Sequence, residues 1–221
     1  MNARRLAERQ ISLPATRDEV VAGDLVVPAG ATGIVVFAHG SGSSRHSSRN
    51  RAVAATLRDT GLATLLFDLL TPSEERRDEV TAELRFDIPF LAARCRAVLA
   101  WAREQNDLAA LRVGLFGAST GAAAALVAAA EERGVRAVVS RGGRPDLAGN
   151  ALARVSAPTL LLVGGHDGTV LELNRAAFDR LAAADKELIV VPGAGHLFEE
   201  PGALDAVAHH AATWFERWLA A

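Results

Sequence analysis

The sequence predicts an α/β fold in which a mostly parallel sheet of about eight strands is covered by helices on both faces. Short and almost wholly apolar runs recur along the chain, as is typical of strands that are buried on both faces. Longer segments with apolar residues at helical spacing lie between these runs. The chain has 221 residues and is 50% apolar. This is enough for one sizeable core, so we expect residues 1–221 to form a single domain.

The expected strands and helices alternate along the chain. Residues 11–13 and 24–27 resemble a hairpin at a sheet edge. The polar and charged stretch 68–85 is expected to be a surface loop with one turn of helix. Further strands are expected at residues 33–38, 63–67, 111–116, 135–140, 159–163 and 187–191. Helices are expected at residues 48–60, 86–101, 171–181 and 201–219 and directly after Gly121.

The overall composition argues against several classes of partner. With 24 basic and 26 acidic residues, the formal net charge is −2. This gives no electrostatic reason to expect binding to nucleic acid or to an anionic membrane surface. The first residues, MNARRLAERQISLP, have no apolar core of signal-peptide length, and no run approaches the length of a membrane span. We therefore expect a cytoplasmic protein.

Reactive residue types are scarce in this chain. Cys95 is the single cysteine and falls at helical spacing in LAARCRAVLAWA, so we expect it to pack in the core. Lys186 is the only lysine, and there is no tyrosine. A Schiff-base lysine in a loop and a tyrosine acid are thereby set aside as catalysts. The histidines are scattered and lack the spacing of helical ligands, so no metal site is expected.

The segment GASTG, residues 117–121, is the strongest motif in the chain. It joins the expected strand 111–116 to the Ala-rich run that follows. A serine between two glycines at a sharp strand-to-helix turn has its hydroxyl exposed, and the small flanking residues let strand and helix approach. This makes Ser119 a candidate nucleophile. The alternative is a glycine-rich turn of an ordinary α/β protein without catalytic function.

Candidate partners for Ser119 follow other expected strands. In a sheet of this kind, ligands bind at the carboxyl ends of the strands. A serine nucleophile needs a base, and the base needs a carboxylate that fixes its tautomer; His196 and Asp167 offer these groups. The competing bases are His166 and His46, whereas His209 and His210 fall in the last helix. The competing acids are Asp146, Asp68, Glu199 and Glu200.

The order of Ser119, Asp167 and His196, with the loop HGSG at residues 39–42, resembles the α/β-hydrolase fold. The short length, the absence of an insertion large enough for a cap domain and the stretch RFDIPFLAARCRAVLAWA resemble the dienelactone-hydrolase-like branch. The resemblance implies a serine hydrolase that cleaves carboxylic esters through an acyl-enzyme, without metal or organic cofactor. Dienelactone hydrolases proper carry a cysteine at the elbow. Ser119 therefore favours a general carboxylester hydrolase over a lactone-specific enzyme.

The resemblance also implies where the oxyanion would bind. The backbone N–H groups of Thr120 and Ser41 are the expected donors, with Gly42 as the alternative to Ser41. The competing interpretation of the HGSG loop is turn chemistry alone. His39 is expected to orient this loop through a ring hydrogen bond and to take no part in catalysis.

Candidate substrate-binding residues are Arg141, Arg144 and Phe86. An arginine fork binds carboxylate or phosphate, although solvated arginine is the alternative, and Phe86 either lines an acyl pocket or packs in the core. The expected partner is a small-molecule ester, and the protein is expected to be a monomer or a homodimer. A thioesterase, a peptidase and a non-catalytic binding protein of the same fold remain open. So does a hydrolytic module that works fused to, or beside, another enzyme.

Overall fold

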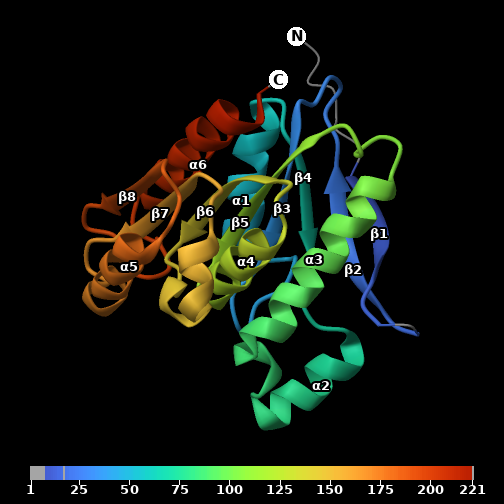
Figure 1. Cartoon of the computed structure of the whole chain (residues 1–221), viewed down its shortest axis with the longest axis horizontal. Helices are drawn as coiled ribbons and strands as arrows, with labels where there is room; N and C mark the ends of the chain where they lie inside the picture. The colour runs from blue at the N-terminus through green and yellow to red at the C-terminus, as the bar shows by residue number, and fades with distance from the viewer. Residues whose placement is uncertain (1–7, 17, 221) are drawn as a thin grey trace.

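The computed structural model describes residues 8–16 and 18–220. They contain one eight-stranded sheet with the strand order β1-β2-β4-β3-β5-β6-β7-β8 (Figure 1). The pairs β1–β2 and β2–β4 are antiparallel, and all the other neighbouring pairs are parallel. The mostly parallel sheet that the sequence predicts is confirmed, and the antiparallel hairpin lies at its edge.

Most observed elements fall within a few residues of the expected ones. The strands are β1 Glu8–Pro14, β2 Val20–Val26, β3 Gly33–Ala38, β4 Ala63–Phe67, β5 Arg112–Ala118, β6 Val135–Arg141, β7 Thr159–Gly164 and β8 Lys186–Val191. The α-helices are α1 Ser48–Asp59, α2 Pro72–Thr81, α3 Ile88–Glu104, α4 Thr120–Glu131, α5 Gly168–Arg180 and α6 Ala203–Leu219. Two 3-10 segments, η1 Leu84–Phe86 and η2 Pro145–Arg154, complete the set.

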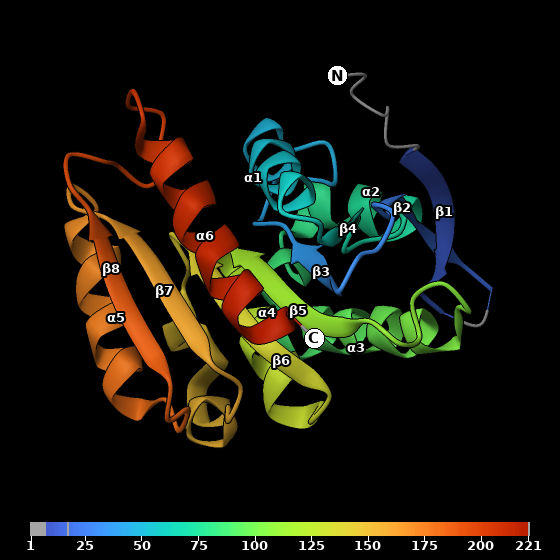
Figure 2. The same ribbon diagram turned by 90° about the horizontal axis from the view of Figure 1, so that it is seen from above.

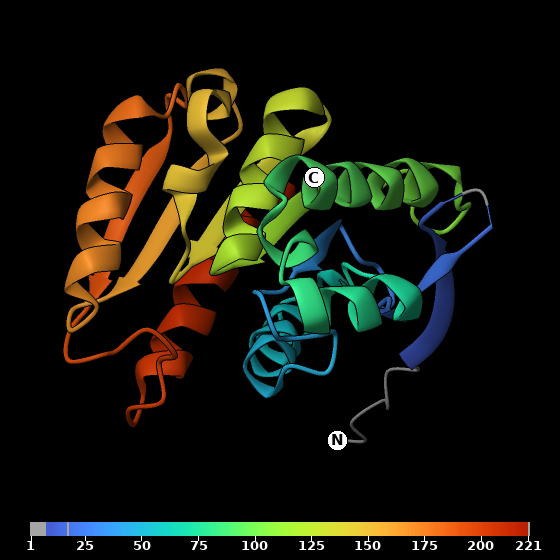
Figure 3. The ribbon, with the colours of Figure 1, turned by 90° about the horizontal axis from the view of Figure 1, so that it is seen from below.

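The helices form a layer on each face of the sheet. Figure 3 shows α3, α4 and α5 along one side of the sheet and α1 and α6 along the other. Each layer buries its own apolar cluster against the strands. On its face, α6 crosses β5 to β8 (Figure 2). Every residue of β3 and β4 is buried, which explains why β3 is continuously apolar and β4 is apolar except at Thr64.

The segment 68–85 differs from its expected form as a loop with one turn of helix, because α2 extends over ten residues within it. Thr71 and Glu74 form a capping box at its start, and Pro72 follows the cap. Arg94 of α3 donates to both carboxylate oxygens of Glu74, at 2.9 and 3.0 Å. A cap and an ion pair stabilise this helix, and Asp78 is its only buried residue. The helix therefore has no apolar stripe by which the sequence could reveal it. Figure 1 shows α2 beyond the end of the sheet at which β4 ends.

The thiol of Cys95 is not reactive in this fold, and the described residues contain neither a membrane-spanning helix nor a cluster of metal-binding side chains. Cys95 is fully buried, as expected, and burial raises the pKa of its thiol to about 12, so it is not a nucleophile at neutral pH. None of the helices in residues 8–16 and 18–220 has both the length and the apolar composition that a membrane span needs. The same residues hold no group of three or more His, Cys, Asp or Glu side chains that could bind a metal ion.

Candidate active site

Ser119 occupies a strained turn between β5 and α4. Its backbone has φ +50° and ψ −122°, whereas β5 ends at Ala118 and α4 begins at Thr120. A residue with a side chain pays about 1–3 kcal/mol for such a conformation, and strain of this kind concentrates at functional sites. The turn thereby places the Ser119 hydroxyl at the carboxyl end of the sheet.

The two glycines of the elbow are required by close backbone contacts. A Cβ at Gly117 would lie 2.4 Å from the Cα of Ala122. A Cβ at Gly121 would lie 2.3 Å from the carbonyl oxygens of both Ala38 and His39. These contacts with backbone atoms leave no room for a side chain. The glycines therefore let α4 pack directly against β5 and against the end of β3.

The segment Arg141–Gly142, at the end of β6, brings Ser119 near His196. The N–H of Ser119 donates to the carbonyl of Arg141 at 3.2 Å. A Cβ built on Gly142 would lie 3.0 Å from the backbone oxygen of His196 and 3.6 Å from its Nδ1 atom. The elbow and the loop after β8 therefore contact two adjacent residues of this segment.

His196 is paired with Asp167. The distance from His196 Nδ1 to Asp167 Oδ2 is 2.6 Å, and the two side chains are 37% and 15% exposed. Asp167 stands at the cap position of α5 but makes no side-chain cap bond, so its carboxylate is available to the imidazole. A carboxylate on Nδ1 fixes the tautomer that leaves Nε2 free to accept a proton. The N–H of His166 donates to the carbonyl of Ala194 at 2.9 Å and ties the two loops together.

Three of the competing acids and bases that the sequence left open, Asp146, Asp68 and His46, are engaged elsewhere. Asp146 receives two hydrogen bonds from Arg144, at 2.9 and 2.8 Å. Asp68 accepts from the backbone N–H of Arg45 at 2.8 Å and is also paired with the guanidinium of that residue. His46 contacts Arg51 at 3.3 Å. The geometry thus favours Asp167 and His196 over these alternatives.

His39 holds the HGSG loop, as expected. Its Nδ1–H donates to the carbonyl of Gly40 at 2.9 Å, and its Nε2 accepts from the N–H of Leu69 at 3.0 Å. One ring nitrogen donates and the other accepts, which requires the neutral imidazole. Burial lowers the pKa of His39 below its ordinary value of 6.5. The ring therefore joins the loop after β3 to the loop after β4.

This environment predicts a pH dependence of stability. The stability that the neutral ring provides is present above the unfolded pKa of 6.5 and is lost as pH falls through the lower native pKa. We expect H39Q to cost about 1–3 kcal/mol at neutral pH, because two buried hydrogen bonds are disturbed. Its unfolding free energy should then fall less than that of the wild type on acidification. Denaturant unfolding across this pH range measures both effects, with H209Q on the exposed side of α6 as the control. Equal pH slopes for H39Q and the wild type would contradict the prediction.

The two expected oxyanion donors lie beside the nucleophile, and one of them is engaged. A Cβ at Gly40 would lie 3.0 Å from the Cβ of Ser119, so the HGSG loop packs against the elbow. The loop turns at Gly42, which has φ +68°, and the N–H of Ser43 donates to the carbonyl of Gly40 at 3.2 Å. The N–H of Ser41 donates to the side-chain oxygen Oγ1 of Thr120 at 2.9 Å.

A cavity of about 470 Å³ adjoins Ser41 and Thr120. The HGSG loop and Thr120 line one side, and residues of α2 with Arg85 line another. Leu69, Leu70 and Leu91 supply apolar surface. Phe86, which was expected either to line an acyl pocket or to pack in the core, is not among the lining residues and is 57% exposed. Its neighbour Arg85 lines the cavity instead and pairs with Asp78 at 2.6 Å.

The other two expected substrate-binding residues do not line this cavity either. Arg141 is only 8% exposed and donates to Asn50 Oδ1 at 3.3 Å. Burial, and then the charge of Arg49, lower the pKa of Arg141 to about 10, so its guanidinium stays charged at neutral pH. Arg144 is held by Asp146, which raises the pKa of Arg144. Each guanidinium therefore contacts a side chain of this chain, and their role as substrate-binding groups stays a prediction.

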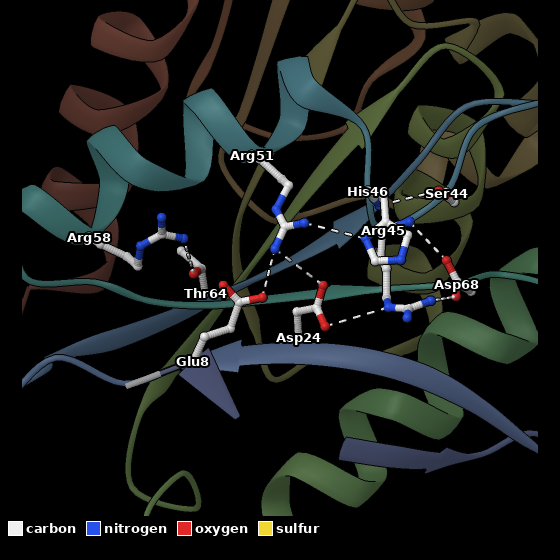
Figure 4. Close-up of polar contacts among 9 residues, drawn as sticks. All are labelled: Glu8, Asp24, Ser44, Arg45, His46, Arg51, Arg58, Thr64 and Asp68. Carbon is white, nitrogen blue, oxygen red and sulfur yellow. Dashed lines mark hydrogen bonds and ion pairs between the residues drawn. The ribbon is translucent and has the colours of Figure 1, made fainter. Parts of the chain in front are cut away.

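An ion-pair network that sequence reasoning did not identify supports the HGSG loop. Asp24 of β2 is buried, 3.5 Å from Arg45 Nε and 3.6 Å from Arg51 Nη2. Arg51 also pairs with Glu8 of β1 at 2.6 Å. Figure 4 shows these side chains as a continuous chain that runs from Glu8 to Asp68. The network connects the edge hairpin with α1 and with the loops after β3 and β4.

The strand order and the serine elbow at the end of the fifth strand define a protein of the α/β-hydrolase fold. The chain belongs to the dienelactone hydrolase family, whose model matches residues 21–220. This is therefore a member of a hydrolase family, and the fold and the resemblance that the sequence predicts are confirmed.

Several individual proteins are similar to this chain. A crystal structure of dienelactone hydrolase from Anabaena variabilis has a TM-score of 0.94 and 54% identity, over 97% of this chain and 99% of that one. Est1E from Butyrivibrio proteoclasticus has a TM-score of 0.78 over 95% of this chain and 98% of its own, and its 16% identity supports the fold alone. A Mycobacterium tuberculosis protein named as a phosphoribosyl transferase is 62% identical over 88% of this chain. The match spans only 43% of that relative.

Proposed function

We propose that this protein is a serine hydrolase that cleaves carboxylic esters, with Ser119 as nucleophile, His196 as base and Asp167 as the group that orients His196. The observation that carries the proposal is the 2.6 Å contact between His196 and Asp167, in loops at the same end of the sheet as a serine in a strained elbow. Membership of a hydrolase family supports the same reaction class. Of the substrates that such a set of residues can attack, which include esters, thioesters and peptides, we propose a carboxylic ester.

Apart from the ester and water, the reaction would use only side chains and backbone amides of this chain. His196 Nε2 takes the proton of Ser119 Oγ while that oxygen attacks the ester carbonyl carbon. The tetrahedral intermediate collapses, the alkoxide leaves with the proton from His196, and an acyl-enzyme remains. Water then attacks the acyl carbon with His196 again as base, which releases the acid and restores Ser119. Donors beside Ser119 stabilise the negative oxygen in both steps.

The cavity size favours a small ester. Its volume of about 470 Å³ lies toward the lower end of the range for ligand pockets, about 300–1,000 Å³. The three leucines would contact the apolar part of the substrate. A panel of short and long acyl esters, thioesters and peptides separates an esterase from a thioesterase or a peptidase. Binding without turnover across the panel would indicate a non-catalytic member of the fold.

The transferase name of the mycobacterial relative describes a protein of which this chain matches less than half. We propose that any transferase activity belongs to the part of that relative that is not matched here. The hydrolase family covers residues 21–220, which leaves almost no part of this chain for a second catalytic unit. This supports the interpretation that the chain is a hydrolytic module that works fused to, or beside, another enzyme.

A fluorophosphonate probe tests the proposed nucleophile. Such a probe phosphonylates an activated serine and displaces fluoride, so we expect one probe molecule to bind per protein molecule and to be located on Ser119 by peptide mass spectrometry. S119A should remain unlabelled, and H196A should react much more slowly because its serine is not activated. Equal labelling of the wild type and S119A would overturn the assignment.

A further inference from the structure

The side chain of Thr120 occupies the acceptor position of an expected oxyanion donor. The N–H of Ser41 donates to Thr120 Oγ1 at 2.9 Å. An amide has one proton, so Ser41 does not offer a free N–H to a substrate oxygen while this bond exists. Both residues line the cavity, and Thr120 is only 4% exposed. The expectation of two free backbone amides therefore does not describe this site fully.

The same hydrogen bond leaves the Thr120 hydroxyl as a donor. A hydroxyl has one proton and two acceptor lone pairs, and the bond from Ser41 uses a lone pair. Within residues 8–16 and 18–220, the Thr120 side chain makes no hydrogen bond other than this one. Its proton therefore has no acceptor in the described part of the chain, although buried polar groups are usually paired. Accepting the bond from Ser41 also polarises the hydroxyl and makes it a stronger donor.

The position of Thr120 allows its amide and its hydroxyl to serve the same oxygen. Thr120 directly follows Ser119 and is the first residue of α4. The N–H groups at the start of a helix have no intrahelical acceptor, so the Thr120 amide is available to a substrate. The HGSG loop packs against Ser119 at Gly40, one residue before Ser41. The bond between Ser41 and Thr120 is therefore formed beside the nucleophile.

We propose that Thr120 donates two hydrogen bonds to the oxyanion, one from its amide and one from its hydroxyl, and that Ser41 is a positioning residue whose N–H orients this hydroxyl. The ligand is the anionic oxygen of a tetrahedral adduct on Ser119, so the inference rests on the proposed function. The competing arrangement requires the hydroxyl to rotate away and the Ser41 amide to contact the oxyanion. The two arrangements predict opposite effects when the hydroxyl is removed.

The decisive variant is T120V, which keeps the backbone amide and the side-chain shape but lacks the hydroxyl. We expect kcat for a short acyl ester to fall by about 10²–10³-fold, the loss typical of one oxyanion donor, with KM changed by only a few-fold. T120S keeps a hydroxyl and should stay within about tenfold of the wild type. T120A provides a second hydroxyl-free variant, for which the same loss of kcat is expected. T159V is the matched control, because Thr159 is buried at the other end of the sheet, where its hydroxyl donates to Ala157.

A transition-state analogue separates oxyanion binding from a general structural role. A trifluoromethyl ketone adds to the serine hydroxyl and forms a tetrahedral adduct with an anionic oxygen. We expect its inhibition constant to weaken in T120V by a factor similar to the loss in kcat/KM, because analogue affinity follows transition-state stabilisation. Affinity for the acid product should change little. Melting temperatures of all variants show whether they are folded.

Two results would overturn the inference in different ways. If the wild type hydrolyses esters and folded T120V retains its kcat and its affinity for the ketone, the Ser41 amide is the donor and only the inference fails. If the wild type neither turns over esters nor reacts with the fluorophosphonate, the proposed function fails and the inference fails with it.

Discussion

Exchanging Ser119 for alanine is expected to lower kcat for ester hydrolysis by about 10⁴-fold or more, with KM within a few-fold of the wild-type value. The variant loses the atom that attacks the carbonyl but keeps the cavity and the oxyanion donors, so some turnover by water attack remains. Steady-state kinetics on a short acyl ester provide the measurement. Any loss of folding would appear in the melting temperature.

The kinetics of combined variants test whether Ser119 and His196 act as one unit. We expect H196A to lose a similar factor, and the double variant to be little worse than either single one, because groups that act in one step are not additive. S156A, which removes an exposed hydroxyl before β7, is the control and should match the wild type. Multiplied losses in the double variant would contradict a shared step, and turnover by S119A at the wild-type rate would contradict the mechanism.

Exchanging Asp167 for asparagine is expected to lower kcat by up to about 10⁴-fold. Asparagine has nearly the same shape, but it can donate to Nδ1 and so stabilise the tautomer that has its proton on Nε2. It also cannot stabilise the imidazolium that forms when His196 takes the proton of Ser119. The effect should appear in kcat, because Asp167 does not line the cavity.

The control for Asp167 is the other acid that the sequence left open. Asp146 is held by Arg144 and makes no hydrogen bond to His196 among the described residues. D146N should therefore keep activity within a few-fold of the wild type, although it loses a partly exposed ion pair worth about 1 kcal/mol or less. A larger loss of kcat in D146N than in D167N would exchange the assignments of the two acids.

Much of the fold was predictable because its central strands are buried on both faces. A strand such as β3 must be apolar at every position, and this pattern is visible without any tertiary information. Helix α2 was not predictable in this way, since Thr71, Glu74 and Arg94 hold it through a cap and an ion pair. The capping box TPSE was the one local signal for this helix. No expected element covers the 3-10 segment η2, which is interrupted at Gly149, where φ is +54°.

Residues of the candidate site were predictable only where their position at the end of a strand determines where they lie in the fold. Ser119 follows the buried strand β5 and His196 follows the edge strand β8, and the ends of parallel strands share one edge of the sheet. The orientations of Arg141, Arg144 and Phe86 depend instead on contacts across loops and helices. Asn50 and Asp146 engage the two arginines, but neither partner can be chosen from the sequence alone. The bond between Ser41 and Thr120, which are 79 residues apart, is of the same kind.

The ion pairs around Asp24 bear on where this chain can be shortened. The family match begins at residue 21, but Glu8 of β1 neutralises part of the Arg51 charge that faces Asp24. A version trimmed to the family boundary would lose β1, expose the free edge of β2 and leave Arg51 with one acidic partner fewer. Arg45, four residues from Ser41, depends on the same carboxylate of Asp24. We therefore expect a version that starts at Glu8 to be more stable than one that starts at residue 21, so that an edge hairpin without a reacting group affects how the chain can be shortened or fused.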